Sequence, residues 1–567
     1  MTAQSDTATP KRSTFAALAV FGERRALVML ALGFSAGLPF FLVFDTLSAW
    51  LRDAGLTLEV IGLFSLATLV YSFKFLWAPF IDRTKVPYLT QRLGHRRSWM
   101  LVTQGFIMLG LWLIAGVDPA SSLGWMAAFA VFVGFCGATQ DITIDAWRIE
   151  AAEISKQGAM AAAYQWGYRI ALLVAGALPL ILAQSYSWNV SYGAMAALMS
   201  VGVLGVLAAP REAQHAIREI HAEGLRRAPI ADGIEWFARV LLMAMGALFV
   251  GSGLSANAGA LAWVLGGLGL GALGETLRAA WGPPFGVWYQ LMSVAAGFGV
   301  IGLAAFPVPG LRTRPGVYLS TALGEPLQDF IARHRGAAAL ILALICFYRL
   351  SDFVLNIMNP FYLDLGFTLI EVAEVRKIFG LVTTILGIFA GGAAIARFGL
   401  IPSLVVGAFA GPLSNLTFIW LAMRGHDLFA LFVAIGIDNI ASGFAGTCLI
   451  AYMSSLTGQG FTATQYALFS SLYAVPGRLV ASQSGRIVEG AAQGADGGGV
   501  FSAFNGLFAN LPAESFAAAF EKSGVSPAAL GSGYVAFFIY STLVGIIAVV
   551  LAFAVARRQG TGAASTP

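Results

Sequence analysis

The sequence predicts an all-α membrane protein with about fourteen transmembrane helices. Two observations predict this class: 58% of the 567 residues are hydrophobic, and only 11% are charged. Soluble domains carry about 25% charged residues, so a chain of this length and composition cannot cover a water-facing surface. Each span needs roughly 20 apolar residues, and apolar runs of that length recur along the whole chain. The lipid bilayer is therefore the expected surroundings.

The predicted spans form two groups of six with an extra pair between them. In chain order they are 26–50, 58–80, 98–117, 122–148, 160–184, 188–209, 236–257, 285–308, 336–361, 368–396, 400–422, 427–455, 464–487 and 531–556. This pattern divides the chain into a tail 1–25, a half 26–209, a linker 210–235, an extra pair 236–308, a linker 309–335, a half 336–556 with an insertion 488–530, and a tail 557–567.

The positions of lysine and arginine predict the orientation. With the N-terminus inside, 23 of the 34 basic residues belong to inside segments, and four fall in outside loops: Arg52, Arg278, Arg424 and Lys522. Cytoplasmic loops carry the excess of lysine and arginine. Both termini are therefore predicted to be cytoplasmic, and the tail 1–25 to precede a retained first span rather than a cleaved signal peptide.

Several function classes find no support in the sequence. The basic residues lie in short loops and not on one continuous face, which argues against a nucleic-acid partner. No pair of the three cysteines has metal or redox spacing. The five histidines do not cluster, and no G-x-x-x-x-G-K-[ST] phosphate loop is present. We therefore expect neither an enzyme nor a transporter driven directly by ATP.

The two halves share a local pattern. Residues 78–83 and 94–97 in the first half, and 391–399 in the second, form helix–tight turn–helix junctions with basic residues at the inside rim. Duplicated halves are a common construction of alternating-access carriers. This similarity favours a carrier of solutes.

Two carboxylates are predicted inside one span. Asp141 and Asp145 are four residues apart, so on a helix they share one face. Two carboxylates so close in a low dielectric resist ionising together, and one is expected to hold a proton. This predicts a proton-coupling site. The alternative is that the pair neutralises Lys74, Arg148 or Arg169 and fixes helix packing.

Two predicted membrane cations have aromatic neighbours. Lys74 is close in sequence to Trp77, and Arg169 follows Tyr164 and Tyr168. Cations bind carboxylates and aromatic faces stack on sugar rings, so these residues predict a bulky, polar, anionic, glycan-like ligand. The alternative is that the cations reach the membrane interface from within an aromatic belt.

The second half adds three candidate ligand-binding residues: Arg349, Asp438 and Arg478. Charged side chains in a span usually face a partner or a wet cavity, because each costs about 2.5–3.5 kcal/mol at mid-bilayer. Arg349 is three residues from Asp352, a spacing at which the two can simply pair. For Asp438, hydrogen bonding between helices is the alternative.

Two segments have no counterpart in the other half. The glycine-rich loop 258–284 is compatible with a re-entrant or interfacial piece. The insertion 488–530 carries phenylalanines at a spacing that suggests amphipathic helices on the membrane face, with a disordered extension as the alternative: Phe501, Phe504, Phe508, Phe516 and Phe520.

The sequence resembles the AmpG muropeptide permease family over 26–209 and 336–556. The strings that carry the resemblance are GFSAGLP at 33–39, FKFLWAP at 73–79, QDITIDAW at 140–147, GYR at 167–169 and FTATQYAL at 461–468. The string around Lys74 also occurs in related acetyl-CoA carriers.

The resemblance implies the major facilitator fold and the proton-driven import of N-acetylglucosaminyl-1,6-anhydro-N-acetylmuramyl peptides across the bacterial inner membrane. It implies a role in cell-wall recycling, and in β-lactamase induction where that circuit exists. It supports Lys74, Asp141, Asp145 and Arg169 as site residues. We expect a monomer with no cofactor besides the proton gradient. The alternatives are a carrier of another bulky anion, such as acetyl-CoA, and a non-transporting membrane sensor.

Overall fold

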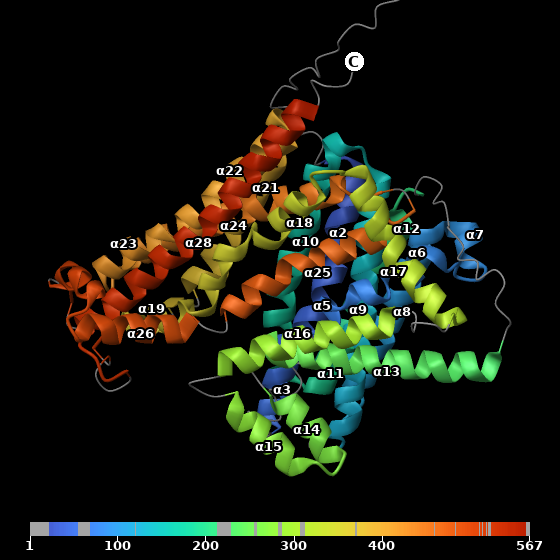
Figure 1. Cartoon of the computed structure of the whole chain (residues 1–567), viewed down its shortest axis with the longest axis horizontal. Helices are drawn as coiled ribbons and strands as arrows, with labels where there is room; N and C mark the ends of the chain where they lie inside the picture. The colour runs from blue at the N-terminus through green and yellow to red at the C-terminus, as the bar shows by residue number, and fades with distance from the viewer. Residues whose placement is uncertain are drawn as a thin grey trace, which may run out of the picture.

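The structure is a computed structural model. It describes residues 22–54, 69–119, 121–211, 228–254, 258–281, 286–306, 312–368, 371–372, 374–458, 460–481, 484–509, 511–512, 514–517, 519 and 523–562. Every regular element in this part of the chain is helical, as the composition predicts. Figure 1 shows two groups of helices that come together toward the top of the view, with further helices that cross the lower part of the view nearly horizontally.

The N-terminal half is built around one close helix pair. Its elements are α2 (Arg24–Phe41), η2 (Leu42–Thr46), α3 (Leu47–Asp53), α5 (Leu69–Ser72), η4 (Lys74–Leu76), α6 (Ala78–Arg83), α7 (Leu89–Leu93), α8 (His95–Ala115), α9 (Leu123–Ala151), α10 (Ile154–Ser185), α11 (Trp188–Leu198) and α12 (Ser200–Ala208). Helices α2 and α10 cross at Gly33 and Gly167, where a side chain would overlap the backbone carbonyls of Tyr164 and Leu30. Glycine is what allows two membrane helices to approach this closely.

The central segment contains α13 (Pro229–Leu254), α14 (Gly259–Gly267), α15 (Gly271–Ala280), α16 (Gly286–Ala305) and α17 (Arg314–Arg333). Helices α13 and α16 pack side by side, seen in green in Figure 1. Val250 and Val294 of this pair pack against Phe73 of the first half. The pair also contacts α17 and α25 (Thr462–Ala481). It therefore touches both halves of the molecule.

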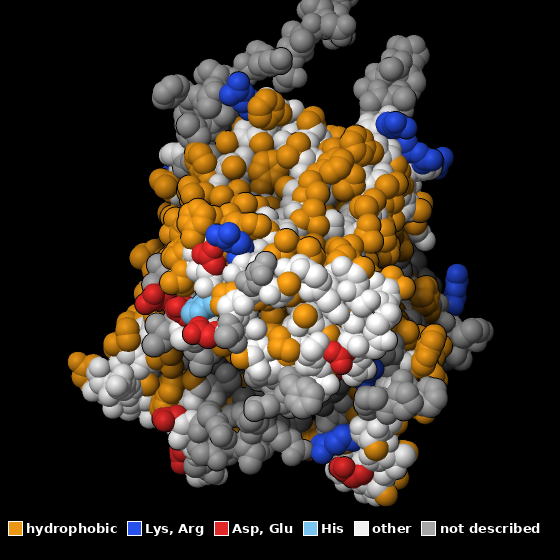
Figure 2. Space-filling view, turned by 90° about the vertical axis from the view of Figure 1, so that its left-hand side faces the viewer, with side chains coloured by type: hydrophobic (Ala, Val, Ile, Leu, Met, Phe, Trp, Pro, Cys, Tyr) orange, Lys and Arg blue, Asp and Glu red, His pale blue; other side chains and the backbone are white. Residues whose placement is uncertain are grey.

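The C-terminal half contains α18 (Ala338–Phe347), η5 (Leu350–Asn356), α19 (Met358–Asp364), η6 (Glu374–Phe379), α21 (Gly380–Phe398), α22 (Leu400–Ser414), α23 (Leu416–Arg424), α24 (Leu428–Ser455), α25, α26 (Ser484–Asp496), η7 (Val500–Phe508) and α28 (Pro527–Gly562). Figure 2 shows a face on which hydrophobic side chains form a broad band, with basic residues beyond one edge and a mixture of acidic, basic and histidine residues beyond the other. Such a band is expected where side chains face lipid.

The predicted count of fourteen spans is not confirmed. In the described part, 11 helices are long and apolar enough to cross a membrane, or up to 12 if α17 and α18, bent by 110°, count as one span. Residues 58–68 of the predicted span 58–80 lie outside the described residues. The predicted span 464–487 begins in α25, which is helical but is not among the 11. Its polar side chains, such as Thr464 and Gln465, are used for contacts with other elements.

The insertion 488–530 packs on its own half. Phe508 and Phe516 are buried in the same core cluster as Phe361 and Phe538. Phe501 and Phe504 remain partly exposed, and Phe520 lies outside the described residues. The described phenylalanines thus include two that serve as core residues of the C-terminal half. The linker residues 212–227 also lie outside the described part.

Candidate functional site

Helix α9 carries three charged residues on one face. Asp141, Asp145 and Arg148 are four and three residues apart, and all three side chains are buried. The helix is buried along this stretch because it packs against α2, α8 and α25. Helical spacing thus brings the charges together, as the sequence predicts.

Asp145 lies between two cations. Its Oδ2 is 3.8 Å from Nζ of Lys74, which η4 brings from the second predicted span. Its Oδ1 is 3.3 Å from Nη2 of Arg148, one turn further along α9. All three side chains are nearly excluded from solvent. For Asp145, therefore, the structure contains the neutralising contacts that the alternative interpretation requires.

Asp141 differs from its neighbour. Its Oδ1 atom is buried and has no hydrogen-bond partner among the described residues. The charges of Lys74 and Asp145 both act on it. The hydroxyl of Tyr71, also close, is likewise without a described hydrogen-bond partner. We call these charged residues the charge cluster: Lys74, Asp141, Asp145 and Arg148. In this cluster the two cations contact the carboxylate of Asp145, whereas the carboxylate of Asp141 has an oxygen without a described hydrogen-bond partner.

The charge cluster reaches the other half of the molecule. Nη1 of Arg148 donates to Oγ of Ser454 on α24 at 2.8 Å. The guanidinium of Arg148 also lies over the ring of Tyr466 on α25, 5.1 Å from its centre. Arg148 of the N-terminal half thus contacts two helices of the C-terminal half, α24 and α25.

A second network ties the halves at the same end. Oδ2 of Asp82 accepts hydrogen bonds from the backbone N–H and the hydroxyl of Thr464 at 2.9 and 2.7 Å. Its Oδ1 accepts one from Arg96 at 2.6 Å, and Arg96 also pairs with Glu150. Sequence reasoning missed these residues as a site, because the junction pattern around 78–97 was their only signal. We call this end, where α6 ends and α8 begins in basic residues, the basic end.

The second half has a polar cluster of its own. Arg349 pairs with Asp352, as their spacing suggested, and its Nη2 donates to Oγ of Ser442 at 2.7 Å. Oδ1 of Asp438 accepts a hydrogen bond from Ser414 at 2.9 Å. Asp438 thus joins α24 to α22, which is the packing role that the sequence left open for it.

The two halves also meet where α10 packs on α21 and α24, a surface here called the seam. Gln165 on α10 donates to Thr447 on α24 at 2.7 Å. Arg169, one turn further along α10, makes no hydrogen bond or ion pair with any described residue, and the charge that acts on it most strongly is that of Arg349.

The two predicted tyrosines lie on the same helix as Arg169. The ring centres of Tyr164 and Tyr168 are 6.1 Å apart. The ring of Tyr168 also lies 5.6 Å from that of Phe41 on α2. The pair thus forms part of an aromatic group between α2 and α10, and its stacking on a sugar stays a prediction.

The remaining two predicted residues lie elsewhere or are not described. Trp77 donates to Thr139 at 3.0 Å, lies against Phe135, and shares a hydrophobic cluster with Met243 of the extra pair. Trp77 therefore packs against a different face of α9 from the one that carries Asp141, and it does not lie at the seam. Arg478 belongs to α25, and its side chain lies outside the described part.

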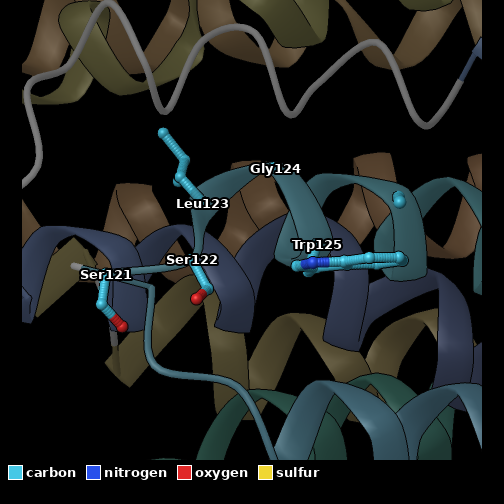
Figure 3. A pocket seen from close by; sticks show the side chains of 6 residues that line it. Ser121, Ser122, Leu123, Gly124 and Trp125 are labelled. Carbon is cyan, nitrogen blue, oxygen red and sulfur yellow. The ribbon is translucent and has the colours of Figure 1, made fainter.

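A shallow depression lies at the beginning of α9, far from these clusters. Figure 3 shows its lining, which includes Ser121, Ser122 and Trp125. Trp125 is separated from Asp141 by about 24 Å along the helix, at 1.5 Å per residue. The depression contains no predicted site residue. In the described part there is also no group of histidine, cysteine or acidic residues able to hold a metal ion.

The comparisons with known proteins agree with this architecture. Residues 86–306 match the model of the Major Facilitator Superfamily. The structure of the proton:xylose symporter XylE is similar with a TM-score of 0.50 and 10% identity, and the match covers 94% of this chain and 95% of that one. The chain is thus a membrane transporter with the major facilitator fold.

Curated relatives show a narrower similarity. The anhydromuropeptide permease of Escherichia coli K12 is 29% identical over 475 residues, which are 83% of this chain and 76% of that protein. Putative transporter AmpG 4 of Rickettsia felis is 27% identical over 472 residues, or 83% of this chain and 91% of that one. The chain is a homologue of the AmpG anhydromuropeptide permeases, and it is a multi-pass inner-membrane protein.

Proposed function

We propose that this protein imports peptidoglycan-derived GlcNAc-1,6-anhydroMurNAc peptides across the bacterial inner membrane together with protons. The homology to a protein named anhydromuropeptide permease supports the substrate class. The buried charge cluster, bonded to the opposite half through Arg148 and Ser454, is the observation that carries the coupling. Imported muropeptides would serve cell-wall recycling and, where the circuit exists, β-lactamase induction.

In this proposal Asp141 binds the coupling proton. An ionised Asp141 competes with Asp145 for Lys74, because both carboxylates act on that cation. When Asp141 is protonated, Lys74 interacts with Asp145 alone, and the ion pair between Asp145 and Arg148 becomes weaker. Since Arg148 also holds Ser454 of the other half, a proton at Asp141 changes how firmly the halves are joined.

The proposed orientation places both termini and the basic end in the cytoplasm. In Figure 1 the halves converge near the C-terminus, while α23, α19 and α26 lie apart from α3 and α11 at the opposite end. The halves are bonded through Asp82–Thr464 and Arg148–Ser454 at the converging end. We take this as the state that is closed to the cytoplasm, and those bonds as the ones that break when the carrier opens inward. The transport unit is proposed to be a monomer that uses no cofactor besides the proton gradient.

The direct test is uptake of radiolabelled GlcNAc-anhydroMurNAc-tripeptide into proteoliposomes, with and without an inward proton gradient. The wild type should accumulate the compound, and a protonophore should abolish the accumulation. Asp141→Asn should retain exchange of substrate down its own gradient but lose uphill uptake. Uphill, pH-dependent transport by Asp141→Asn would refute the role of Asp141. Inhibition by acetyl-CoA, with no uptake of the muropeptide, would instead assign the protein to the thioester carriers.

A further inference from the structure

Two arginines from opposite halves meet at the seam. Arg169 belongs to α10, and Arg349 lies between α18 and η5. Gln165, four residues before Arg169 on α10, and Arg349 both lie beside Gly446 of α24, and Arg349 is the charged group that acts most strongly on Arg169. Like charges placed together inside a membrane protein repel each other, and charged groups at that depth normally face an opposite charge.

The side chains of Arg349 and Gln165 converge beside Gly446 on α24. A side-chain carbon at Gly446 would lie 3.0 Å from Nη1 of Arg349 and 3.4 Å from Oε1 of Gln165. Arg349 and Gln165 therefore approach the same small space from the two halves. Gln165 and Arg169 are four residues apart on α10 and share one face of that helix. The absence of a side chain at Gly446 leaves room there for the guanidinium of Arg349.

Among the described residues, the charges at the seam are not balanced. Arg349 is paired with Asp352, whereas Arg169 has no hydrogen bond or ion pair in the described part of the chain. Both arginines are only partly buried. Lys74, another cation considered for ligand binding, is by contrast buried and held by Asp145.

We propose that Arg169 and Arg349 together bind a carboxylate of the transported solute, which then bridges the two halves. The flat, forked guanidinium groups match the two oxygens of a carboxylate. The hydroxyl of Ser442 accepts from Arg349 and can donate its own hydrogen beside the site. An anion bound there cancels the repulsion between the halves and so favours their approach around the solute. This inference rests on the proposed function, since it takes the peptide carboxylates of a muropeptide as the ligand.

The test compares two ligands of the same size that differ in whether their carboxylates are free or converted to amides. GlcNAc-anhydroMurNAc-tripeptide, and the same compound with its carboxylates converted to amides, are titrated into the full-length protein in nanodiscs. The wild type should bind the acid about ten- to a hundred-fold more tightly, as expected for charge-assisted hydrogen bonds. Arg169→Gln should bind both compounds with the weaker affinity, and Arg169→Lys should keep part of the preference.

Arg349 needs a matched variant because its removal leaves Asp352 without its cation. The double variant Arg349→Gln/Asp352→Asn keeps the charge balance, and should also lose the preference for the acid. Arg424→Gln serves as the control, since Arg424 is largely exposed and pairs with Asp427. Its preference should equal that of the wild type.

The possible failures are distinct. Equal binding of acid and amide by the wild type, or an unchanged preference in Arg169→Gln, would overturn the carboxylate site while leaving muropeptide transport in place. No binding of either compound by the wild type would overturn the proposed function and this inference with it. Binding of the amide by Arg169→Gln, at the wild-type affinity for that compound, shows that the variant is folded.

Discussion

At the scale of single residues, side chains that look equivalent in the sequence make different contacts in the structure. Asp141 and Asp145 occupy the same face of α9, yet Asp145 contacts Lys74 and Arg148, while Oδ1 of Asp141 has no described hydrogen-bond partner. Removing a charge from a buried ion pair leaves its partners uncompensated, which is costly.

Asp145→Asn should therefore destabilise the protein much more than Asp141→Asn. We expect a loss of about 3–5 kcal/mol for the former, because Lys74 and Arg148 would remain buried without a carboxylate. Thermal unfolding in one detergent, compared across the two variants and the wild type, measures the difference. Equal melting temperatures for the two variants would show that Asp145 does not hold the cations.

Glu371 offers a test of pH dependence away from the membrane-spanning helices. The backbone N–H of Thr368, the Thr368 hydroxyl and His426 hold the pKa of Glu371 below its ordinary value of 4.5. A lowered pKa in the folded state means that the contribution to stability is complete above pH 4.5 and disappears as the pH falls through the folded-state pKa.

Glu371→Gln should accordingly lower the melting temperature at pH 7, by about 2–4 °C, and the difference from the wild type should vanish in acid. Scanning calorimetry at pH 7 and in acid, well below the ordinary pKa of a glutamate, checks both parts. A difference that persists or grows in acid would mean that the amide is harmful for a reason other than the lost charge.

At the scale of elements, close helix crossings decide which side chains reach the seam. Helix α10 packs on α2 at one side and on α21 and α24 at the other. Its glycine Gly167 lies against the backbone of Leu30, and this contact fixes the rotation that turns Gln165 and Arg169 toward the other half.

Gly167→Ala should separate α2 from α10 and strongly reduce both stability and uptake, because the added methyl group overlaps the carbonyl of Leu30. Gly176→Ala is the matched control on the same helix, since nothing lies within 4 Å of the space that its side chain would take. The yield of monodisperse protein and the rate of uptake are the two measurements. Similar behaviour of the two variants would contradict the close crossing of α2 and α10.

At the scale of the whole molecule, the two halves are joined by few polar contacts at the basic end. Thr464 is the key residue of one of them, because both its backbone N–H and its hydroxyl bind Asp82. Such a contact is suited to form in one state of a carrier and break in the other.

Thr464→Val removes the hydroxyl bond and should shift the population toward the state that is open at the basic end. Spin labels at the exposed positions Arg92 and Arg335, one near each half, in a cysteine-free background, should then show a larger share of long distances. Thr462→Val, which loses only a 3.4 Å bond to the carbonyl of Gly458 four residues earlier, is the control. An unchanged distance distribution in Thr464→Val would remove Asp82–Thr464 as a gate.

The sequence by itself determined the features that depend on neighbouring residues. Apolar runs placed the membrane helices, a four-residue spacing placed Asp141 and Asp145 on one face, and a three-residue spacing paired Arg349 with Asp352. Each of these is local, because helical periodicity alone decides which side chains share a face. The short strings around Lys74, Asp141 and Arg169 also identified the AmpG homology.

Only the tertiary structure decided which charges meet. Lys74 and Arg148 both contact Asp145, Arg349 and Gln165 lie together beside Gly446, and Trp77 packs against the extra pair. The network of Asp82 with Thr464 joins residues 382 positions apart. Such partners depend on how helices rotate and cross, and hydropathy carries no information about rotation between helices distant in the chain. The same reason explains why the count of spans was not settled by apolar length: α25 uses its polar face for contacts that only the assembled halves provide.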